Sequence, residues 1–304
     1  NLQASQQNLV AQVISNYFDV VKQQAHIDSI SAQIRSAKQS LASIQKQSQL
    51  GLATQLQASN VENNVQQLHL SLLQTQQRLQ QARNNLTAST GVPIDSNVPG
   101  IRLSTELPAL DNLQLDHWWQ QAQQHNLSLL AATAGVQKSY HDYQQTDSQK
   151  YPTGRISANH YSYKNDNVML RISGNFYDGG LNKAQTQQAR LNWMASQQNL
   201  TASQRSTKQQ LHSTLYNLRN NSQQIQLQQS LLNTATISLA ATQKEYELGV
   251  ADLVAVLEAE QKVASNEVNL INARYDLLVY QSNLKQLAGS LDVPDLLLLD
   301  AMLD

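Results

Sequence analysis

The chain repeats itself at one fixed offset, and this repeat restricts the folds that it can adopt. Gly51 and Gly249 are 198 residues apart, and so are Gly91 and Gly289. Glycine readily takes the left-handed backbone conformation that commonly ends a helix. The sequence therefore predicts two helical hairpins built to one plan, with Gly51 and Gly249 at the bends.

Apolar residues recur at every seventh position between the two glycines of each repeat. The two series are Ala58, Val65, Leu72, Leu79 and Leu86, and Val256, Val263, Leu270, Leu277 and Leu284. This spacing puts one apolar seam along a helix that packs on another helix. The string ASQQNL occurs at 4–9 and again at 195–200, an offset that differs from the first by one heptad. A shift of one heptad keeps the seam in register, as coiled-coil packing requires.

Neutral side chains, Gln above all, supply most of the polarity. Charged residues make up 14% of the chain, against roughly 25% in typical soluble domains, and the net charge is −1. Such a balance provides no footprint for nucleic acid and no basic face for anionic lipid. The chain contains no Cys, which excludes disulfides and thiolate metal sites within it and suits a periplasmic protein. No apolar run is long enough for a transmembrane helix. The first residues carry no helix-start signal, so we expect the numbering to begin inside a longer natural protein.

The coarse organisation follows from helical patterns and breakers. Helices are predicted over 2–48, 53–88, 115–125, 127–149 and 182–248. All five Pro residues are placed outside the helices, and Pro93, Pro99 and Pro108 mark an irregular connector. The helix over 182–248 would be about 100 Å long. A soluble single domain has no use for such a length, which indicates that something is spanned.

No Gln occurs between Gln149 and Gln185. The segment there, YPTGRISANHYSYKNDNVMLRISGNFYDGG, predicts a β-hairpin. Val168, Leu170, Ile172 and Phe176 alternate there with Met169, Arg171, Ser173 and Asn175, and the turn is predicted at Lys164 to Asn167. Strands of about ten residues suit a tilted membrane-spanning strand. The alternative is a soluble hairpin packed on the helices. Two strands cannot close a barrel, so the membrane interpretation requires strands from elsewhere.

Three segments carry a family resemblance. NFYDGGLNKAQTQQARLNW joins a strand to a helix through an aromatic-x-Gly-Gly junction, YELGVADLVAVLEAEQ opens a second-repeat helix, and WWQQAQQHNLSLLAATAGVQKS leads into the hairpin. With them the chain resembles the TolC-like family of outer-membrane efflux and secretion channels (outer membrane efflux proteins) over nearly its whole length. The family's first hairpin and the helices before it have no counterpart ahead of residues 1–20.

The resemblance implies a mainly α fold in which long antiparallel coiled-coil helices form an α-barrel in a homotrimer. The short β-hairpin would contribute to a shared transmembrane β-barrel. One domain over 1–304 would comprise a partial first repeat (1–92), a connector with equatorial helices (93–150), the β-hairpin (151–180), the second-repeat helices (181–290) and a C-terminal tail (291–304).

Site residues are also implied by the resemblance. It places Gly51 and Gly249 at the periplasmic tip, where an adaptor would make contact. Acidic side chains narrow the closed end of the best-known member, and Glu258 matches one of these positions while Ala255 leaves the other without a carboxylate. Asp252 is predicted to share that face. Three Glu258 carboxylates on one axis would repel one another and attract cations. The alternative is that Glu258 and Glu260 are ordinary solvated residues.

Polar pairs between the repeats lock the closed state of the same member. The matching positions here are Gln57, Leu56 and Ala251, and Ala251 offers no polar group. Tyr246, one turn before Gly249, is the gating candidate that survives, with simple helix packing as the alternative. Gly179 and Gly180 form the strand-to-helix junction.

No catalytic constellation emerges. The seven His show no pair at metal-ligand spacing, and no phosphate-binding loop or supported Ser-His-Asp set is present. We therefore expect no enzyme activity, no metal and no cofactor. The resemblance predicts a channel in the outer membrane with its helical tube in the periplasm, serving tripartite efflux or type I secretion. Its partners would be a periplasmic adaptor (membrane fusion) protein, an inner-membrane transporter and outer-membrane lipid. The alternative is a helical coiled-coil scaffold or secretion-apparatus protein without a pore.

Overall fold

The computed structural model describes residues 2–51, 53–101, 105, 107–108, 112–160, 167–174 and 178–303. Its elements are α1 (Leu2–Gln49), α2 (Gln55–Thr90), α3 (Leu115–His125), α4 (Leu127–Ser148), β1 (Thr153–Asn159), β2 (Asn167–Ser173), α5 (Leu181–Glu247), α6 (Leu253–Ala288) and α7 (Val293–Asp300). The mainly helical fold predicted from the sequence is confirmed.

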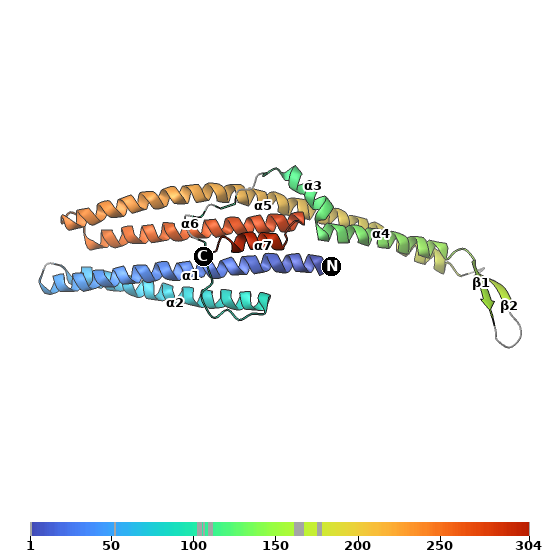
Figure 1. Ribbon diagram of the computed structural model, residues 1–304, viewed down its shortest axis with the longest axis horizontal. Helices are drawn as coiled ribbons and strands as arrows, with labels where there is room; N and C mark the ends of the chain where they lie inside the picture. The colour runs from blue at the N-terminus through green and yellow to red at the C-terminus, as the bar shows by residue number, and fades with distance from the viewer. Residues whose placement is uncertain are drawn as a thin grey trace.

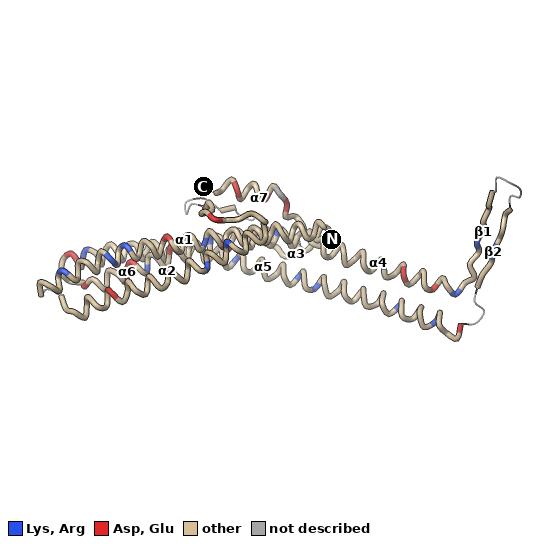
Figure 2. The backbone as a smooth tube through the Cα atoms, turned by 90° about the horizontal axis from the view of Figure 1, so that it is seen from below, with Lys and Arg blue, Asp and Glu red and all other residues tan. Residues whose placement is uncertain are grey.

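Four long helices lie side by side in the order α5, α6, α1, α2 (Figure 1). Each is antiparallel to its neighbour, and α2 and α5 form the two edges of the layer. Both helical turns, between α1 and α2 and between α5 and α6, lie at one end, which we call the tip. At the other end α5 runs on beyond the layer with α4 packed along it, and this two-helix arm leads to the β-hairpin (Figure 2).

The internal repeat sets the helix boundaries. The end of α1 at Gln49 and the end of α5 at Glu247 are one repeat offset apart, and α2 and α6 each contain 36 residues at equivalent positions. All ten heptad positions are buried or half-buried. The apolar seams therefore face neighbouring helices, as predicted.

The connector between α2 and α3 crosses the layer and is held by side chains of the helices beneath it. Gln24 of α1 exchanges two hydrogen bonds with the backbone of Val98, at 2.9 and 3.0 Å. Further on, the Tyr275 hydroxyl of α6 accepts a hydrogen bond from the Ile101 N–H at 2.9 Å. The bonds that follow along the connector are Arg274 to Thr105, Gln281 to Pro108 and Arg219 to Leu113. The connector thus links α1, α6 and α5 in turn.

The joint between α3 and α4 packs against the end of α6. Asn126 caps α4, because its side chain accepts a hydrogen bond from the Leu129 N–H at 2.9 Å. Its Nδ2 donates to the Leu287 carbonyl of α6 at 2.8 Å. Trp118 of α3 is buried on Leu211, Leu215 and Leu218 of α5. The short helix α3 is therefore fixed to the long helices at mid-length.

The C-terminal tail contains a helix that the sequence analysis did not predict. Pro294 lies in the first turn of α7, so the expectation that every Pro stands outside the helices is wrong. The first turn tolerates Pro because the N–H groups there have no helical partner. Lys285 of α6 pairs with Asp295 of α7, and Leu296 and Leu299 pack on the cluster around Phe18.

The hairpin pairs β1 and β2 in antiparallel register, from Thr153 opposite Ser173 to Asn159 opposite Asn167. Each described strand has seven residues, shorter than the ten expected. The expected turn residues 164–166, and Asn175 and Phe176, lie outside the described residues. Within the described chain, no helix combines the length and apolar character needed to cross a membrane.

Candidate functional site

The turns at the tip are built around two glycines with left-handed backbone. Gly51 has φ +73° and Gly249 has φ +76°. After α5, the Gly249 N–H donates to the Tyr246 carbonyl at 3.0 Å and the Val250 N–H to the Glu245 carbonyl at 2.8 Å. This is the paired pattern of a Schellman motif, which satisfies the last carbonyls of the helix. Both glycines are exposed and no atom would obstruct a Cβ on either, so both turns are open to a partner.

The residues that start α2 and α6 cap their own helices. Thr54 caps α2, and Gln57 completes a capping box by accepting a hydrogen bond from the Thr54 N–H at 2.9 Å. Asp252, one repeat offset after Thr54, caps α6 by accepting from the Ala255 N–H at 2.9 Å. Gln57 and Asp252 therefore each cap their own helix, and the described contacts include no hydrogen bond between them.

An apolar cluster joins the two repeats near the tip. It contains Ala37, Ile44, Val61, Val65, Leu253 and Leu257, and the half-buried Tyr246 packs against it. The Tyr246 hydroxyl accepts a hydrogen bond from the Gln47 side chain at 3.5 Å. Tyr246 thus connects α5 with α1, the helix of the other repeat. The structure supports this residue as a contact between repeats, whereas its part in gating remains a prediction.

Glu258 lies one residue after the buried Leu257 and is exposed. Among the described residues it forms no ion pair and no side-chain hydrogen bond, so its carboxylate is available to solvent. Glu260, two residues on, differs, because it accepts a hydrogen bond from Ser36 of α1. Glu260 therefore helps to hold α6 on α1. Because of this contact, Glu260 is not an ordinary solvated residue.

Polar contacts continue along the boundary between α1 and α6. Besides Ser36 with Glu260, Lys22 pairs with Asp276, and His26 hydrogen-bonds Asn272 at 3.1 Å. Burial, assisted by the charges of Arg78 and Lys22, lowers the pKa of His26, so its ring is neutral at neutral pH. Sequence reasoning missed these pairs. A signal was present: Lys22 and His26 are four residues apart, as are Asn272 and Asp276, and such spacing puts each pair on one helix face.

The strand-to-helix junction is fixed by glycine and by an acidic cap. Gly179 and Gly180 both have positive φ, +61° and +88°. The Asp178 carboxylate accepts hydrogen bonds from the N–H groups of Gly180 and Asn182, at 3.0 and 2.9 Å. These bonds lower the pKa of Asp178 below its usual value. The junction therefore sets where α5 begins.

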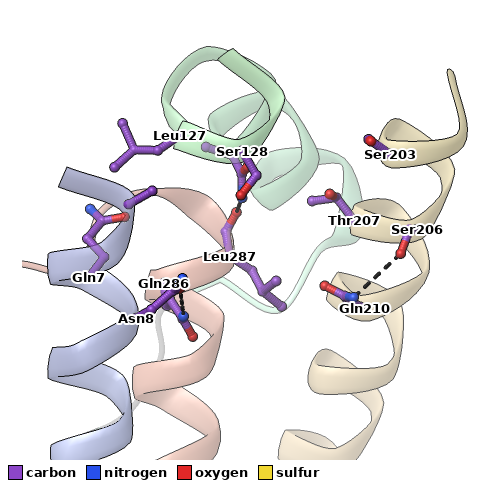
Figure 3. Close-up of a pocket in the computed structure, with 12 residues that line it drawn as sticks. Gln7, Asn8, Leu127, Ser128, Ser203, Ser206, Thr207, Gln210, Gln286 and Leu287 are labelled. Atoms are coloured by element: carbon purple, nitrogen blue, oxygen red, sulfur yellow. Dashed lines mark hydrogen bonds between the residues drawn. The ribbon is translucent and has the colours of Figure 1, made fainter. Parts of the chain in front are cut away.

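A polar pocket of about 390 Å³ opens between α1, α4, α5 and α6, as Figure 3 shows. Gln7, Ser128 and Gln210 line it from three of these helices, and Gln286 donates to Asn8 at 2.6 Å. No charged side chain lines it. Within the described part of the chain, no group of three His, Cys, Asp or Glu is placed to hold a metal ion. The lining of this pocket is therefore neutral and polar.

Comparison with known proteins agrees with this architecture. The family model described as outer membrane efflux protein matches residues 118–290. Outer membrane protein TolC of Salmonella enteritidis is 24% identical over 322 residues, which cover 99% of this chain and 65% of that protein. Alkaline protease secretion protein AprF of Pseudomonas aeruginosa is 23% identical over 308 residues, covering 97% of this chain and 64% of that protein. The chain thus spans slightly less than two thirds of the length of these relatives.

A solved structure has the same fold. The outer membrane channel CmeC of Campylobacter jejuni superposes with a TM-score of 0.81 at 12% identity, covering 99% of this chain and 67% of that one. The fold and the outer-membrane localisation predicted from the resemblance are confirmed. Since the matched family model covers more than half of its residues, the chain belongs to the outer membrane efflux protein family.

Proposed function

We propose that this protein is the exit duct of a tripartite efflux pump or a type I secretion system and acts as a homotrimer. One observation carries the proposal: a layer of four antiparallel helices has free edges on both sides, bends at one end and a β-hairpin at the other (Figure 1). Three such layers joined edge to edge form a hollow tube, and three hairpins together with further strands form a shared β-barrel in the outer membrane.

Apolar side chains at the edges of the layer support the joining of subunits. Leu70 and Leu73 on α2 are exposed, as are Leu227, Leu231 and Ile237 on α5. At about 1.5 Å per residue, both groups lie about 15–30 Å from the tip. Within one subunit α1 and α6 separate the two edges. The α2 edge of one copy can therefore pack on the α5 edge of a second copy, because the exposed apolar residues of both edges lie at similar distances from the tip.

In this assembly the tip meets a periplasmic adaptor, which connects the duct to an inner-membrane transporter. The turns at Gly51 and Gly249 offer exposed contact points, and Tyr246 with the apolar cluster around Leu253 holds the two repeats of one subunit together. Glu258 narrows the axis and Asp252 and Gln57 shape the closed end. The transporter supplies the energy, and the duct conducts substrates passively without catalysing a reaction. In this duct, residues 1–92 and 181–290 form the wall of the helical tube. Residues 93–150, the connector and equatorial helices, surround the tube at mid-length.

A cysteine pair tests the trimer. The 304 residues contain no Cys, so Leu70→Cys with Leu231→Cys introduces the only thiols among them. The two positions lie at about the same distance from the tip, 15 and 16 residues along their helices. We expect oxidation to link α2 of one subunit to α5 of the next and to give a covalent trimer in a denaturing gel.

Each single variant serves as the control and can give at most a dimer. A pair of Leu130→Cys with Leu231→Cys controls for random collision, because Leu130 is exposed on α4 but not on the α2 edge. A cysteine pair that stays monomeric under oxidation, in a protein that is folded and inserted, would support the helical scaffold without a pore.

Glu258→Ala tests the constriction. If three carboxylates converge on the axis, they concentrate cations there. Removing them is expected to lower the cation-to-anion permeability ratio several-fold in single-channel recordings, with Glu260→Ala as the matched control because Glu260 faces α1. Unchanged conductance and ion preference would remove Glu258 from the pore.

A further inference from the structure

The two faces of the β-hairpin differ completely in chemistry. In an antiparallel pair, residues directly opposite each other project to the same face. One face therefore carries Gly154 and Ile172, Ile156 and Leu170, and Ala158 and Val168, and the other carries Thr153 and Ser173, Arg155 and Arg171, Ser157 and Met169, and Asn159 and Asn167. An apolar face and a largely polar face are what a sheet needs between lipid and a watery lumen.

On the polar face, the pairs at the two ends hydrogen-bond each other, and Ser157 lies opposite the uncharged Met169. Thr153 and Ser173 hydrogen-bond each other at 3.1 Å, and Asn159 donates to Asn167 at 3.3 Å. Arg155 lies opposite Arg171. Two guanidinium groups have donors only and carry the same charge, so they cannot bond each other, and like charges in this position destabilise a sheet.

Nothing in the described part of the hairpin neutralises this arginine pair. The segments 151–160 and 167–174 contain no Asp or Glu, and neither strand is coloured red in Figure 2. Both arginines are exposed, and among the described residues neither forms an ion pair. Asp178, the nearest described acid after β2, uses its carboxylate to cap α5. Two planar, permanently charged groups thus stand side by side with all their donors free for a ligand.

We propose that Arg155 and Arg171 form an anion-binding ring in the lumen of the duct at the level of the outer membrane. The ring would take the carboxylate, phosphate or sulfonate groups of solutes that leave the cell, because guanidinium groups bind such oxygens with paired hydrogen bonds. The inference rests on the proposed function, since only subunits assembled around a lumen bring three arginine pairs to one level. The helical tube between the tip and the ring has neutral, amide-rich walls. The ring would therefore be the place near the exit where solutes are selected by their charge.

Single-channel recording with inorganic pyrophosphate as the probe tests the ring. The protein is produced from its whole gene and inserted into planar bilayers. Pyrophosphate added on the hairpin side is expected to block the current, and Arg155→Gln with Arg171→Gln is expected to weaken that block about tenfold or more, as clustered charges concentrate counter-ions by about that factor. Block from the tip side should change less, because the probe must first traverse the tube.

Three variants separate charge, shape and assembly. The double Arg→Lys variant keeps the charges and should retain most of the block, whereas Met169→Gln changes the same face without altering charge and should retain all of it. The double Gln variant removes a repulsion, so its trimer yield should equal or exceed that of the natural protein. Channels of normal conductance with unchanged block in the double Gln variant would overturn the ring while leaving the duct intact. Failure of the natural protein to form any channel would instead refute the proposed function.

Discussion

Gly289→Ala is expected to destabilise the protein far more than Gly91→Ala, although the two glycines occupy equivalent places in the repeat. Both end a 36-residue helix with left-handed backbone, at φ +76° and +73°. In the Gly91→Ala variant, the only cost is that of holding Ala in the left-handed backbone conformation, which lowers the free energy of unfolding by about 1–2 kcal/mol.

The surroundings of Gly289 add a second cost. A Cβ there would stand 2.2 Å from the carbonyl oxygen of His125, whereas nothing lies within 4 Å of one on Gly91. The obstacle is backbone, and Asn126 anchors it through its bonds to Leu129 and Leu287. It cannot move without breaking the joint between α3, α4 and α6. We expect a total loss of about 4 kcal/mol or more.

The measurement is urea unfolding of separated subunits in mild detergent, followed by helical circular dichroism. Asn126→Ala in the Gly289→Ala background is informative, because it releases the anchored joint. The double variant should lose less stability than the sum of the two single variants. Equal midpoints for Gly289→Ala and Gly91→Ala would show that the close approach at His125 does not limit the fold.

Phe18→Ala has the second largest expected effect. Phe18 is 2% exposed and packs on Tyr275 of α6, with ring centroids 5.3 Å apart. It belongs to the cluster in which α1, α6 and the segment around α7 meet. Truncation of a buried Phe removes the packing and leaves a cavity, so we expect a loss of about 3–5 kcal/mol.

The repeat supplies the matched control for this variant. Tyr216 lies one repeat offset after Phe18 but is 60% exposed on the edge helix α5. In the same urea experiment on separated subunits, Tyr216→Ala should change the free energy of unfolding by no more than about 0.5 kcal/mol. A comparable loss in both variants would contradict the view that burial, and not repeat position, decides the energetics.

The repeat itself was readable from the sequence because its signals are local. The glycines at the bends, the apolar heptads and the breaker residues of the connector each act within a few residues, and the predicted helix ends agree with the structure to within two residues. The prediction for Pro294 was wrong for the same local reason, since a proline in the first turn of a helix resembles one that stops it.

Contacts between distant segments could not be read in this way. Phe18 and Tyr216 have the same register in their helices, and only the packing of α6 and the C-terminal segment on α1 makes one of them buried. Likewise, the pairing of Lys22 with Asp276 depends on α1 lying beside α6, which heptads do not specify. One contact at the tip does have a local signal, because the spacing from Thr54 to Gln57 is that of a capping box.

The connector that crosses the layer has a mechanical consequence. It fastens α1, α6 and α5 to one another at mid-length. Beyond it, α1 and α6 are joined by the bonds of His26 to Asn272 and of Ser36 to Glu260, and nearest the tip by a small apolar cluster and the bond from Gln47 to Tyr246. From Tyr275 to the start of α6 the lever arm is about 33 Å at about 1.5 Å per residue. A tilt of only about 10° about this fulcrum swings the free ends by about 6 Å. In the proposed duct, a small tilt at the connector would therefore displace the tips by about the diameter of a solvated ion.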